Sequence, residues 1–306
     1  MSLIPLGILA ASGAGAVSVA GYAAGGETSS SKVTTVDKFT FSDDSRSTLG
    51  TGLSSALIAA AAASNSGVAG YFAGGRGDSY VNSIQKFAFT DDSRSTLSTT
   101  LSSSKAYFGG MSNSGTAGYF GGGGTGNSST SVEKLTFAAE TIATLGTGLS
   151  FNSRYNTAMS NSGTAGYFGG GFLSTVATVD KFAFPSDSRS TLGTGLSSAR
   201  FGMVGFADVG VAGYFGGGYS SLSTVDKFAF PSDSRTTLGN GLSSGTQSPA
   251  GMSNSGTAGY SAGGETSSSK VTTVDKFAFP SDSRSTLATG LSSARSQATG
   301  FQNEAL

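Results

Sequence analysis

The stretch TVDKFAFPSDSRSTLGTGLSSAR, from Thr178 to Arg200, decides the architecture of this chain because close copies of it recur before and after it. One of these copies, TVDKFAFPSDSRTTLGNGLSS, runs from Thr224 to Ser244. Three landmarks define six copies of the unit: the Tyr of AGY, the first apolar residue after VDK or its variants, and the Leu of STLGTG. In chain order these are Tyr22, Tyr71, Tyr119, Tyr167, Tyr214 and Tyr260; Phe39, Phe87, Leu135, Phe182, Phe228 and Phe277; and Leu49, Leu97, Leu145, Leu192, Leu238 and Leu287.

The spacing of the landmarks predicts a fixed framework with one variable loop in each unit. The second landmark precedes the third by 10 residues in all six copies, and each Leu precedes the next Tyr by 22 residues. The step from the Tyr to the second landmark varies instead, running 17, 16, 16, 15, 14 and 17 residues. All the length variation therefore lies just after a glycine pair. Units of about 46 to 49 residues with this behaviour are typical of stacked or ring-shaped repeat proteins.

Each unit is expected to form about four short strands. The apolar segment TAGYFGGG predicts a buried strand that turns sharply at its glycines, and TVDKFAF alternates, with Asp180, Phe182 and Phe184 on one face. PSDSR predicts a turn, and STLGTGL a weaker strand. The segment before SNSG, such as RYNTAM, is expected to be a fourth strand that an NSG hairpin joins to the next unit. The Ala-rich run at residues 56–64 has the register of this fourth strand, so the prediction is all-β.

The composition excludes several functions. The 306 residues are 37% hydrophobic and 12% charged, with 18 basic and 18 acidic side chains, so no basic face is expected for nucleic acid or an anionic membrane. Cys and His are both absent, which removes disulfides, thiolate metal sites and histidine chemistry, and we expect no cofactor and no metal. The start MSLIPLGILAASGAGAV carries no Lys or Arg before its apolar stretch, so we expect no secretory signal. That stretch is also too short to span a bilayer.

Four strands per unit, with a glycine pair after an apolar strand, resemble the kelch repeat of β-propellers. The glycine pairs are Gly25-Gly26, Gly74-Gly75, Gly169-Gly170, Gly216-Gly217 and Gly263-Gly264, with a four-glycine run at Gly121. The resemblance implies that Phe39 and its equivalents fill the family's aromatic position and that Leu49 and its equivalents stand where the family has Trp. A family Arg near the end of the unit matches Arg154, Arg200 and Arg295, with Lys105 in one copy.

The fold implied by this resemblance is an all-β, six-bladed β-propeller of four-stranded kelch-like repeats of about 48 residues. An open β-solenoid is the alternative. Six units carry seven candidates for the fourth strand, because GILAAS (7–12) and ARSQATGFQ (294–302) both align with it. We therefore divide the chain into an N-terminal segment 1–16, as a first-blade strand or docking arm, and a propeller 17–306 with a closing or spare strand at 292–306. A spare strand would allow docking on another subunit in a homo-oligomer or on a larger assembly.

No set of residues supports a reaction, so we do not expect an enzyme. Kelch-type copper oxidases require His and Cys, and both are absent. A recurrent Arg stands beside Asp, or one residue beyond it, at the same turn of five units, which favours a solvated turn pair over an active site. These residues are Arg46, Arg94, Arg189, Arg235 and Arg284. The tripeptide Arg76-Gly77-Asp78 occurs once, in a variable loop, and chance explains it.

Variable loops and fourth strands remain as candidates for ligand binding, because exposed aromatic residues on a rigid scaffold stack on sugars or anchor protein contacts. The candidate residues are Tyr80, Tyr107, Phe108, Phe151, Tyr155, Phe172, Phe201 and Tyr219.

A short apolar start followed by Gly/Ser/Thr-rich β repeats is similar to structural proteins of tailed bacteriophages. We therefore expect a non-enzymatic structural or adhesive virion protein, such as a tail fibre, spike or capsid decoration protein, made without a signal peptide and found outside the cell. Its expected partners are a host-surface glycan or other virion proteins. The alternative is a cellular kelch-like adaptor for protein–protein interaction.

Overall fold

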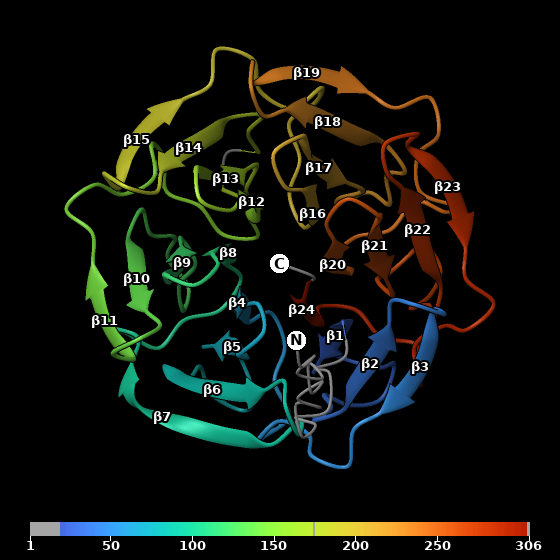
Figure 1. Ribbon diagram of the computed structural model, residues 1–306, viewed down its shortest axis with the longest axis horizontal. Coiled ribbons are helices and arrows are strands. Elements are labelled where there is room, and N and C mark those ends of the chain that lie inside the picture. The colour runs from blue at the N-terminus through green and yellow to red at the C-terminus, as the bar shows by residue number, and fades with distance from the viewer. Residues whose placement is uncertain (1–18, 174, 305–306) are drawn as a thin grey trace, which may run out of the picture.

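The computed structural model describes residues 19–173 and 175–304, which form six antiparallel sheets of four strands each. The sheets surround a central axis as the blades of a propeller (Figure 1). The six-bladed all-β prediction is therefore confirmed. Within the described residues, no helix has the length and apolar character needed to cross a membrane.

The four strands of each blade follow one another from the axis outward. Blade 1 is β24 (Thr299–Asn303), β1 (Ala20–Ala24), β2 (Val36–Thr40) and β3 (Ser45–Thr48), and blade 2 is β4 (Ala61–Asn65), β5 (Ala69–Ala73), β6 (Ser83–Ala88) and β7 (Arg94–Thr100). Blade 3 is β8 (Gly109–Asn113), β9 (Ala117–Gly121), β10 (Val132–Thr136) and β11 (Thr141–Thr144), and blade 4 is β12 (Thr157–Asn161), β13 (Ala165–Gly169), β14 (Val179–Ala183) and β15 (Ser188–Thr191). Blade 5 is β16 (Val204–Asp208), β17 (Ala212–Gly216), β18 (Val225–Ala229) and β19 (Ser234–Thr237), and blade 6 is β20 (Ala250–Asn254), β21 (Ala258–Ala262), β22 (Val274–Ala278) and β23 (Ser283–Thr286).

The strand β24, near the C-terminus, closes the ring by pairing with β1 (Figure 1). Their register sets Tyr22 opposite Phe301, and the two rings stack with centroids 4.9 Å apart. Closure therefore also completes the apolar core between blades 1 and 2, to which both residues belong. The other candidate strand or docking arm, in segment 1–16, lies outside the described residues.

The segment expected as the fourth strand of each unit forms the innermost strand of the next blade. RYNTAM, for example, leads into β12, which the NSG hairpin joins to β13. The hairpin glycine Gly163 has a φ of 80°, which suits this tight turn. The Ala-rich run 56–64 is strand only from Ala61 onward, because Ala59 adopts a left-handed conformation with φ 53°.

The outermost strand is SRST in blades 1, 4 and 6 and SRTT in blade 5, not STLGTGL as expected. In blade 4 it ends at Thr191, before Gly193 and Gly195. A side chain at Gly195 would collide with the carbonyl oxygen of Ala177, so the chain passes too close to its neighbour at this point to continue as a regular strand. Blade 2 has Ser and Thr at the corresponding positions, and there β7 continues to Thr100. The difference between the blades agrees with this explanation.

Large apolar side chains pack between the blades, as the KFAF pattern predicts. The Phe residues of this pattern are at most 8% exposed: Phe39, Phe41, Phe87, Phe89, Phe182, Phe184, Phe228, Phe230, Phe277 and Phe279. Burial of each ring stabilises the fold by about 1.5 to 3 kcal/mol relative to exposure. The glycine of AGY makes room for a large residue of the preceding blade, since a Cβ at Gly213 would overlap Met159 and one at Gly259 would overlap Phe206.

A Tyr, a Lys and a carboxylate, which together we call the clasp, fasten each blade to the next. In blade 4 Tyr167 and Lys181 are paired in register on adjacent strands, and both donate hydrogen bonds to Asp233, in the β18–β19 turn of blade 5. The Tyr167 Oη–Asp233 Oδ1 distance is 2.8 Å and the Lys181 Nζ–Asp233 Oδ2 distance is 2.7 Å. The other clasps are Tyr22/Lys38/Asp92, Tyr71/Lys86/Glu140, Tyr119/Lys134/Asp187, Tyr214/Lys227/Asp282 and Tyr260/Lys276/Asp44.

The expected solvated pair within the SDSR turn does not form. The turn Asp belongs to a clasp, and the Arg instead reaches back to the buried Asp of VDK, with Arg235 Nη1 at 3.6 Å from Asp226 Oδ1. The other oxygen of Asp226 accepts hydrogen bonds from Ser197 and from Arg200, in the loop that leads into blade 5. Arg46, Arg189 and Arg284 are placed like Arg235, with N–O distances of 3.5 to 3.8 Å. In blade 2 Gln85 replaces the Asp, and Arg94 forms no ion pair with any described residue.

Candidate binding surface

The two ends of the propeller axis carry different parts of the repeat. The variable loops and the entries to the innermost strands lie at one end, which we call the loop face. The NSG hairpins and PSDS turns lie at the other end, the turn face. This follows from the antiparallel order of the strands, because the chain enters β12 at the loop face and returns there along β13. Differences between units are therefore concentrated on the loop face.

A closed ring of six backbone hydrogen bonds surrounds the axis at the loop face, which we call the mouth. One residue of each blade contributes, two positions before the innermost strand: Ala59, Tyr107, Tyr155, Gly202, Ser248 and Gln297. Each N–H donates to the carbonyl oxygen of the ring residue from the adjacent blade, with N–O distances of 2.6 to 3.0 Å. All six have a left-handed φ between 53° and 64°, which costs a non-glycine residue about 1 to 2 kcal/mol. The hydrogen bonds offset this strain and fix the positions of the buried Tyr107 side chain and the half-buried Tyr155 side chain.

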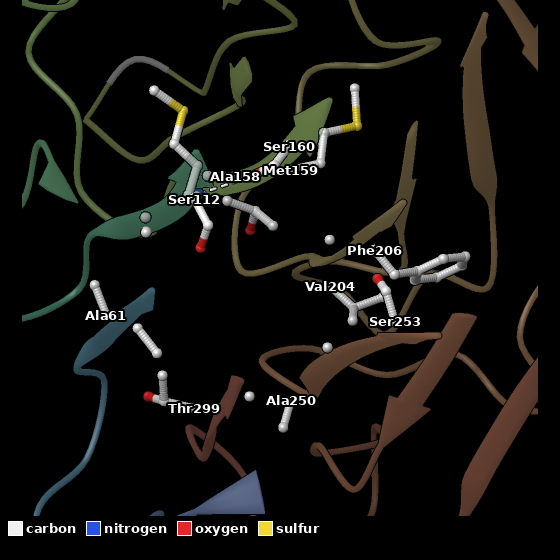
Figure 2. A pocket seen from close by; sticks show the side chains of 18 of the residues that line it. Ala61, Ser112, Ala158, Met159, Ser160, Val204, Phe206, Ala250, Ser253 and Thr299 are labelled. Carbon is white, nitrogen blue, oxygen red and sulfur yellow. Dashed lines mark hydrogen bonds between the residues drawn. The ribbon is translucent and has the colours of Figure 1, made fainter. Parts of the chain in front are cut away.

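Behind the mouth, the innermost strands line a central cavity of about 450 Å³. Figure 2 shows Ser112 and Ser160 on neighbouring strands beside the cavity, while Met159 and Phe206 point away from it into the packing between blades. The serines tie the strands together, because Ser112 Oγ accepts a hydrogen bond from the Ser64 N–H and Ser160 Oγ accepts one from the Ser112 N–H. Between these strands the cavity wall is therefore built from short side chains and backbone.

The cavity offers little charge to a ligand. Its lining includes one carboxylate, Glu304, and neither Lys nor Arg. Burial raises the pKa of Glu304 to about 7, and Gln302 Nε2 donates to its Oε1 at 2.6 Å. In residues 19–173 and 175–304, no three His, Cys, Asp or Glu side chains come together as they would to hold a metal ion. The cavity thus lacks the cationic groups that would hold an anion.

Five of the eight aromatic residues predicted to bind ligand form one continuous group on the loop face, which we call the aromatic ladder. It begins at the mouth, where the rings of Tyr107 and Tyr155 have centroids 4.3 Å apart. Phe172 packs against Tyr155 at 6.2 Å and Phe201 at 5.0 Å, edge-on in both cases. The ladder ends where Phe201 stacks on Tyr219 at 4.7 Å.

Backbone hydrogen bonds between loops hold the ladder in place. The Phe172 N–H donates to the Arg154 carbonyl oxygen at 2.7 Å, and the Tyr219 N–H donates to the Phe201 carbonyl oxygen at 2.8 Å. Phe172 is 41% exposed and Tyr219 is 55% exposed, so both present open ring surface. The end of the ladder from Phe172 to Tyr219 is therefore an exposed apolar patch, which marks a binding surface more often than scattered single residues do.

Two arginines flank the mouth end of the ladder. The guanidinium carbon of Arg154 lies 4.8 Å from the Tyr107 ring centroid and 5.8 Å from that of Tyr155, and that of Arg76 lies 5.7 Å from Tyr107. Such cation–π contacts orient the guanidinium groups without neutralising them. Burial, followed by the neighbouring Tyr155 hydroxyl, raises the pKa of Tyr107, so this ring carries no charge of its own at neutral pH.

Three of the predicted residues lie outside the ladder. Phe108 is 5% exposed and packs edge-on against Phe120 in the core, so it offers no open ring surface on the loop face. It follows the left-handed Tyr107 directly, and its side chain is directed inward. Phe151 is half-buried beside Gly171, and Tyr80 is half-buried in the loop of Arg76. Neither ring stacks on a ladder residue within the described part of the chain.

Sequence reasoning missed the role of both arginines. The resemblance to kelch repeats matches Arg154 to the position of Arg200 and Arg295, which are buried and pair with carboxylates at 2.9 and 3.0 Å. In the loop before blade 4, however, Ser153 occupies that position, and Arg154 comes one residue later and turns toward the ladder. Arg200 stands four residues after the Leu of the GLS motif before it, whereas Arg154 stands five residues after its own. This one-residue difference is the sequence signal that distinguishes the two arginines. Arg76 belongs to the tripeptide that the sequence alone attributes to chance.

Comparison with known proteins establishes the fold and nothing finer. The sequence matches no protein-family model, and no curated protein matches it. Among solved structures, that of YjhT matches with a TM-score of 0.69 over 87% of this chain and 96% of the YjhT chain, at 12% sequence identity. The chain is thus a six-bladed β-propeller similar in fold to YjhT.

Proposed function

We propose that this chain is a non-enzymatic carbohydrate-binding module that acts as a structural and adhesive protein of a virus particle. The aromatic ladder is the observation that carries the proposal. A pyranose ring has an apolar face of C–H groups, which is attracted to the negative face of an aromatic ring. Phe172 and Tyr219 offer such faces, and the backbone bonds around them keep the surface preorganised.

Binding rather than catalysis is favoured by how the repeat uses its acids. The recurrent turn carboxylates accept hydrogen bonds in clasps, and the recurrent carboxylates of VDK are buried in ion pairs or hydrogen bonds. These groups stabilise the ring and do not project from the loop face. The ladder itself contributes aromatic rings, backbone and two flanking arginines, and elsewhere on the loop face Glu27 is paired with Lys270 at 3.0 Å.

The position on a virus particle rests on the likeness of the Gly/Ser/Thr-rich β repeats to structural proteins of tailed bacteriophages. Immunogold electron microscopy of the source culture tests it. Label on tail tips would support an adhesin, and label on heads a decoration protein. Label confined to cells would contradict the virion proposal and favour a cellular adaptor.

Carbohydrate binding is tested on a glycan array, followed by calorimetry with the best ligand. Phe172→Ala and Tyr219→Ala should each weaken binding about tenfold, because each removes a stacking surface. Val211→Ala is the matched control, since Val211 is 47% exposed but lies in a hairpin of the turn face, and it should change affinity by less than about twofold. Absence of glycan binding, or equal losses in the ladder and control variants, would contradict the proposal.

A further inference from the structure

We infer that the mouth end of the ladder binds the acidic group of an anionic saccharide, a sugar that carries a carboxylate or a sulfate. The inference rests on the carbohydrate-binding function proposed above and adds the ligand class. The acidic group lies against Arg76 and Arg154, while the sugar rings stack along Tyr155, Phe172 and Phe201.

Most positive charges of the chain are neutralised within the fold. Fourteen of the 18 basic side chains form ion pairs with carboxylates. In residues 19–173 and 175–304, the four without such a pair are Lys32, Arg76, Arg94 and Arg154. Lys32 instead donates to the Gly77 carbonyl oxygen at 2.6 Å. Half of the unneutralised cations therefore lie on the ladder.

The two ladder arginines also keep most of their hydrogen-bond donors. Within the described residues, the Arg76 side chain donates no hydrogen bond, and Arg154 donates one, from Nη1 to the Gly126 carbonyl oxygen at 3.0 Å. A guanidinium carries five N–H donors in a planar fork, which matches two oxygens of a carboxylate or sulfate. The Nε atoms of both arginines are buried, so the donors open to an anion are those on Nη1 and Nη2 of Arg76 and on Nη2 of Arg154. The Tyr107 ring holds both guanidinium groups in place.

The surrounding charges place the anion at the mouth. Both arginines contact Tyr107, which lies on the mouth, while the lining of the cavity behind it includes the carboxyl group of Glu304 and neither Lys nor Arg. An anionic group is thus favoured at the mouth and disfavoured deeper in the cavity. Asp78 is exposed in the same loop as Arg76 but forms no ion pair with it, and its charge opposes anion binding.

The test compares ligands that differ only in charge. One pair is an oligogalacturonate and its methyl ester, and the other is a sulfated oligosaccharide and its desulfated form, each titrated into the full chain by calorimetry. The charged member of at least one pair should bind at least about tenfold more tightly, and the difference should shrink as salt is added. Preference for the first or second pair identifies carboxylate or sulfate as the recognised group.

Charge variants then assign the effect to the two arginines. Arg76→Gln and Arg154→Gln should each weaken binding of the charged ligand about tenfold and leave binding of the neutral one unchanged. Arg94→Gln is the matched control, because it removes an equally unpaired charge from an outer strand and should have no effect. Asp78→Asn should strengthen binding of the charged ligand only. Thermal melts of all variants confirm that each is folded.

The outcomes separate this inference from the proposed function. Equal binding of charged and neutral ligands, with losses in Tyr219→Ala, would overturn the inference and leave carbohydrate binding intact. A loss in Arg94→Gln equal to that in Arg154→Gln would also overturn it, because the effect would then be one of net charge. Binding of neither ligand pair, in wild type or variants, would count against both.

Discussion

Asp233 illustrates how a single residue joins two blades. It has a left-handed φ of 54°, which Asp adopts more readily than most residues, and this conformation directs its carboxylate toward the neighbouring blade. There it accepts hydrogen bonds from Tyr167 and Lys181. All six clasp carboxylates have φ values between 50° and 56°, including Glu140, so backbone conformation and side-chain bonding are coupled in every unit.

Replacement of Asp233 tests this coupling. Asp233→Ala should lower the free energy of unfolding by about 1 to 3 kcal/mol, because it leaves two partly buried donors without an acceptor. Asp233→Asn should cost less, since the amide keeps an acceptor oxygen and tolerates the left-handed conformation. Ser232→Ala in the same turn is the control, as Ser232 is exposed and its side chain, among the described residues, bonds only to Ser234. Urea unfolding measures all three, and equal midpoints for Asp233→Ala and Ser232→Ala would refute the role of the clasp.

At the scale of the element, the innermost strands are limited by how closely they approach one another. One position on each of these strands faces the backbone of its neighbour around the axis. A Cβ added at Gly251 would collide with the carbonyl oxygen of Gly205, and one at Gly205 with that of Ala158. The repeat can therefore vary its loops freely but not this strand position, where only Gly or Ala occurs.

The consequence is measurable with a pair of Gly→Ala variants. Gly251→Ala should destabilise the protein by about 1 to 3 kcal/mol, because strand backbone must shift to relieve the overlap. Gly193→Ala is the control, since nothing lies within 4 Å of a Cβ there, and it should be neutral or stabilising by up to about 1 kcal/mol. Differential scanning calorimetry distinguishes the two. A Gly251→Ala variant as stable as wild type would show that the strands are not in close contact.

At the scale of the whole molecule, the clasps should make the ring lose stability as the pH rises into the alkaline range. Burial, together with the clasp carboxylate, raises the pKa of the clasp tyrosines, to about 12 for Tyr71, and burial also raises that of Tyr107. A raised folded-state pKa means that the neutral hydroxyl is favoured in the ring. Its contribution to stability is complete below pH 10, the unfolded value, and is lost as pH rises through the folded value.

Seven of the ten tyrosines should therefore stay protonated slightly above pH 10 while the ring is folded. Near-ultraviolet absorbance of tyrosinate, followed together with circular dichroism, checks this expectation. At higher pH these tyrosines should ionise in one cooperative step that coincides with loss of β structure. Ionisation of all ten in folded protein near pH 10 would contradict the clasp at every blade.

The sequence predicted the ring better than the contacts between its units. Landmark spacing and the resemblance to kelch repeats were enough for six four-stranded blades, because local patterns determine strands and turns. The partner of Asp233 was not predictable in this way, since Tyr167 lies 66 residues away and Arg235 is much closer in the sequence. The ladder could be predicted in part from the sequence, because aromatic residues in variable loops could be identified. The outward turn of Arg154 and the inward turn of Phe108 depend on backbone conformation that composition does not show.

The clasp has a consequence for how the gene can recombine. Every unit carries the donors for one neighbour and the acceptor for the other, so all six junctions are chemically alike. Recombination between two copies within the gene joins the N-terminal part of one unit to the C-terminal part of another. The new neighbours still carry the Tyr, Lys and carboxylate that form a clasp. Loop sequences can thus be reshuffled, duplicated or exchanged along the gene without any new solution to the problem of holding adjacent blades together.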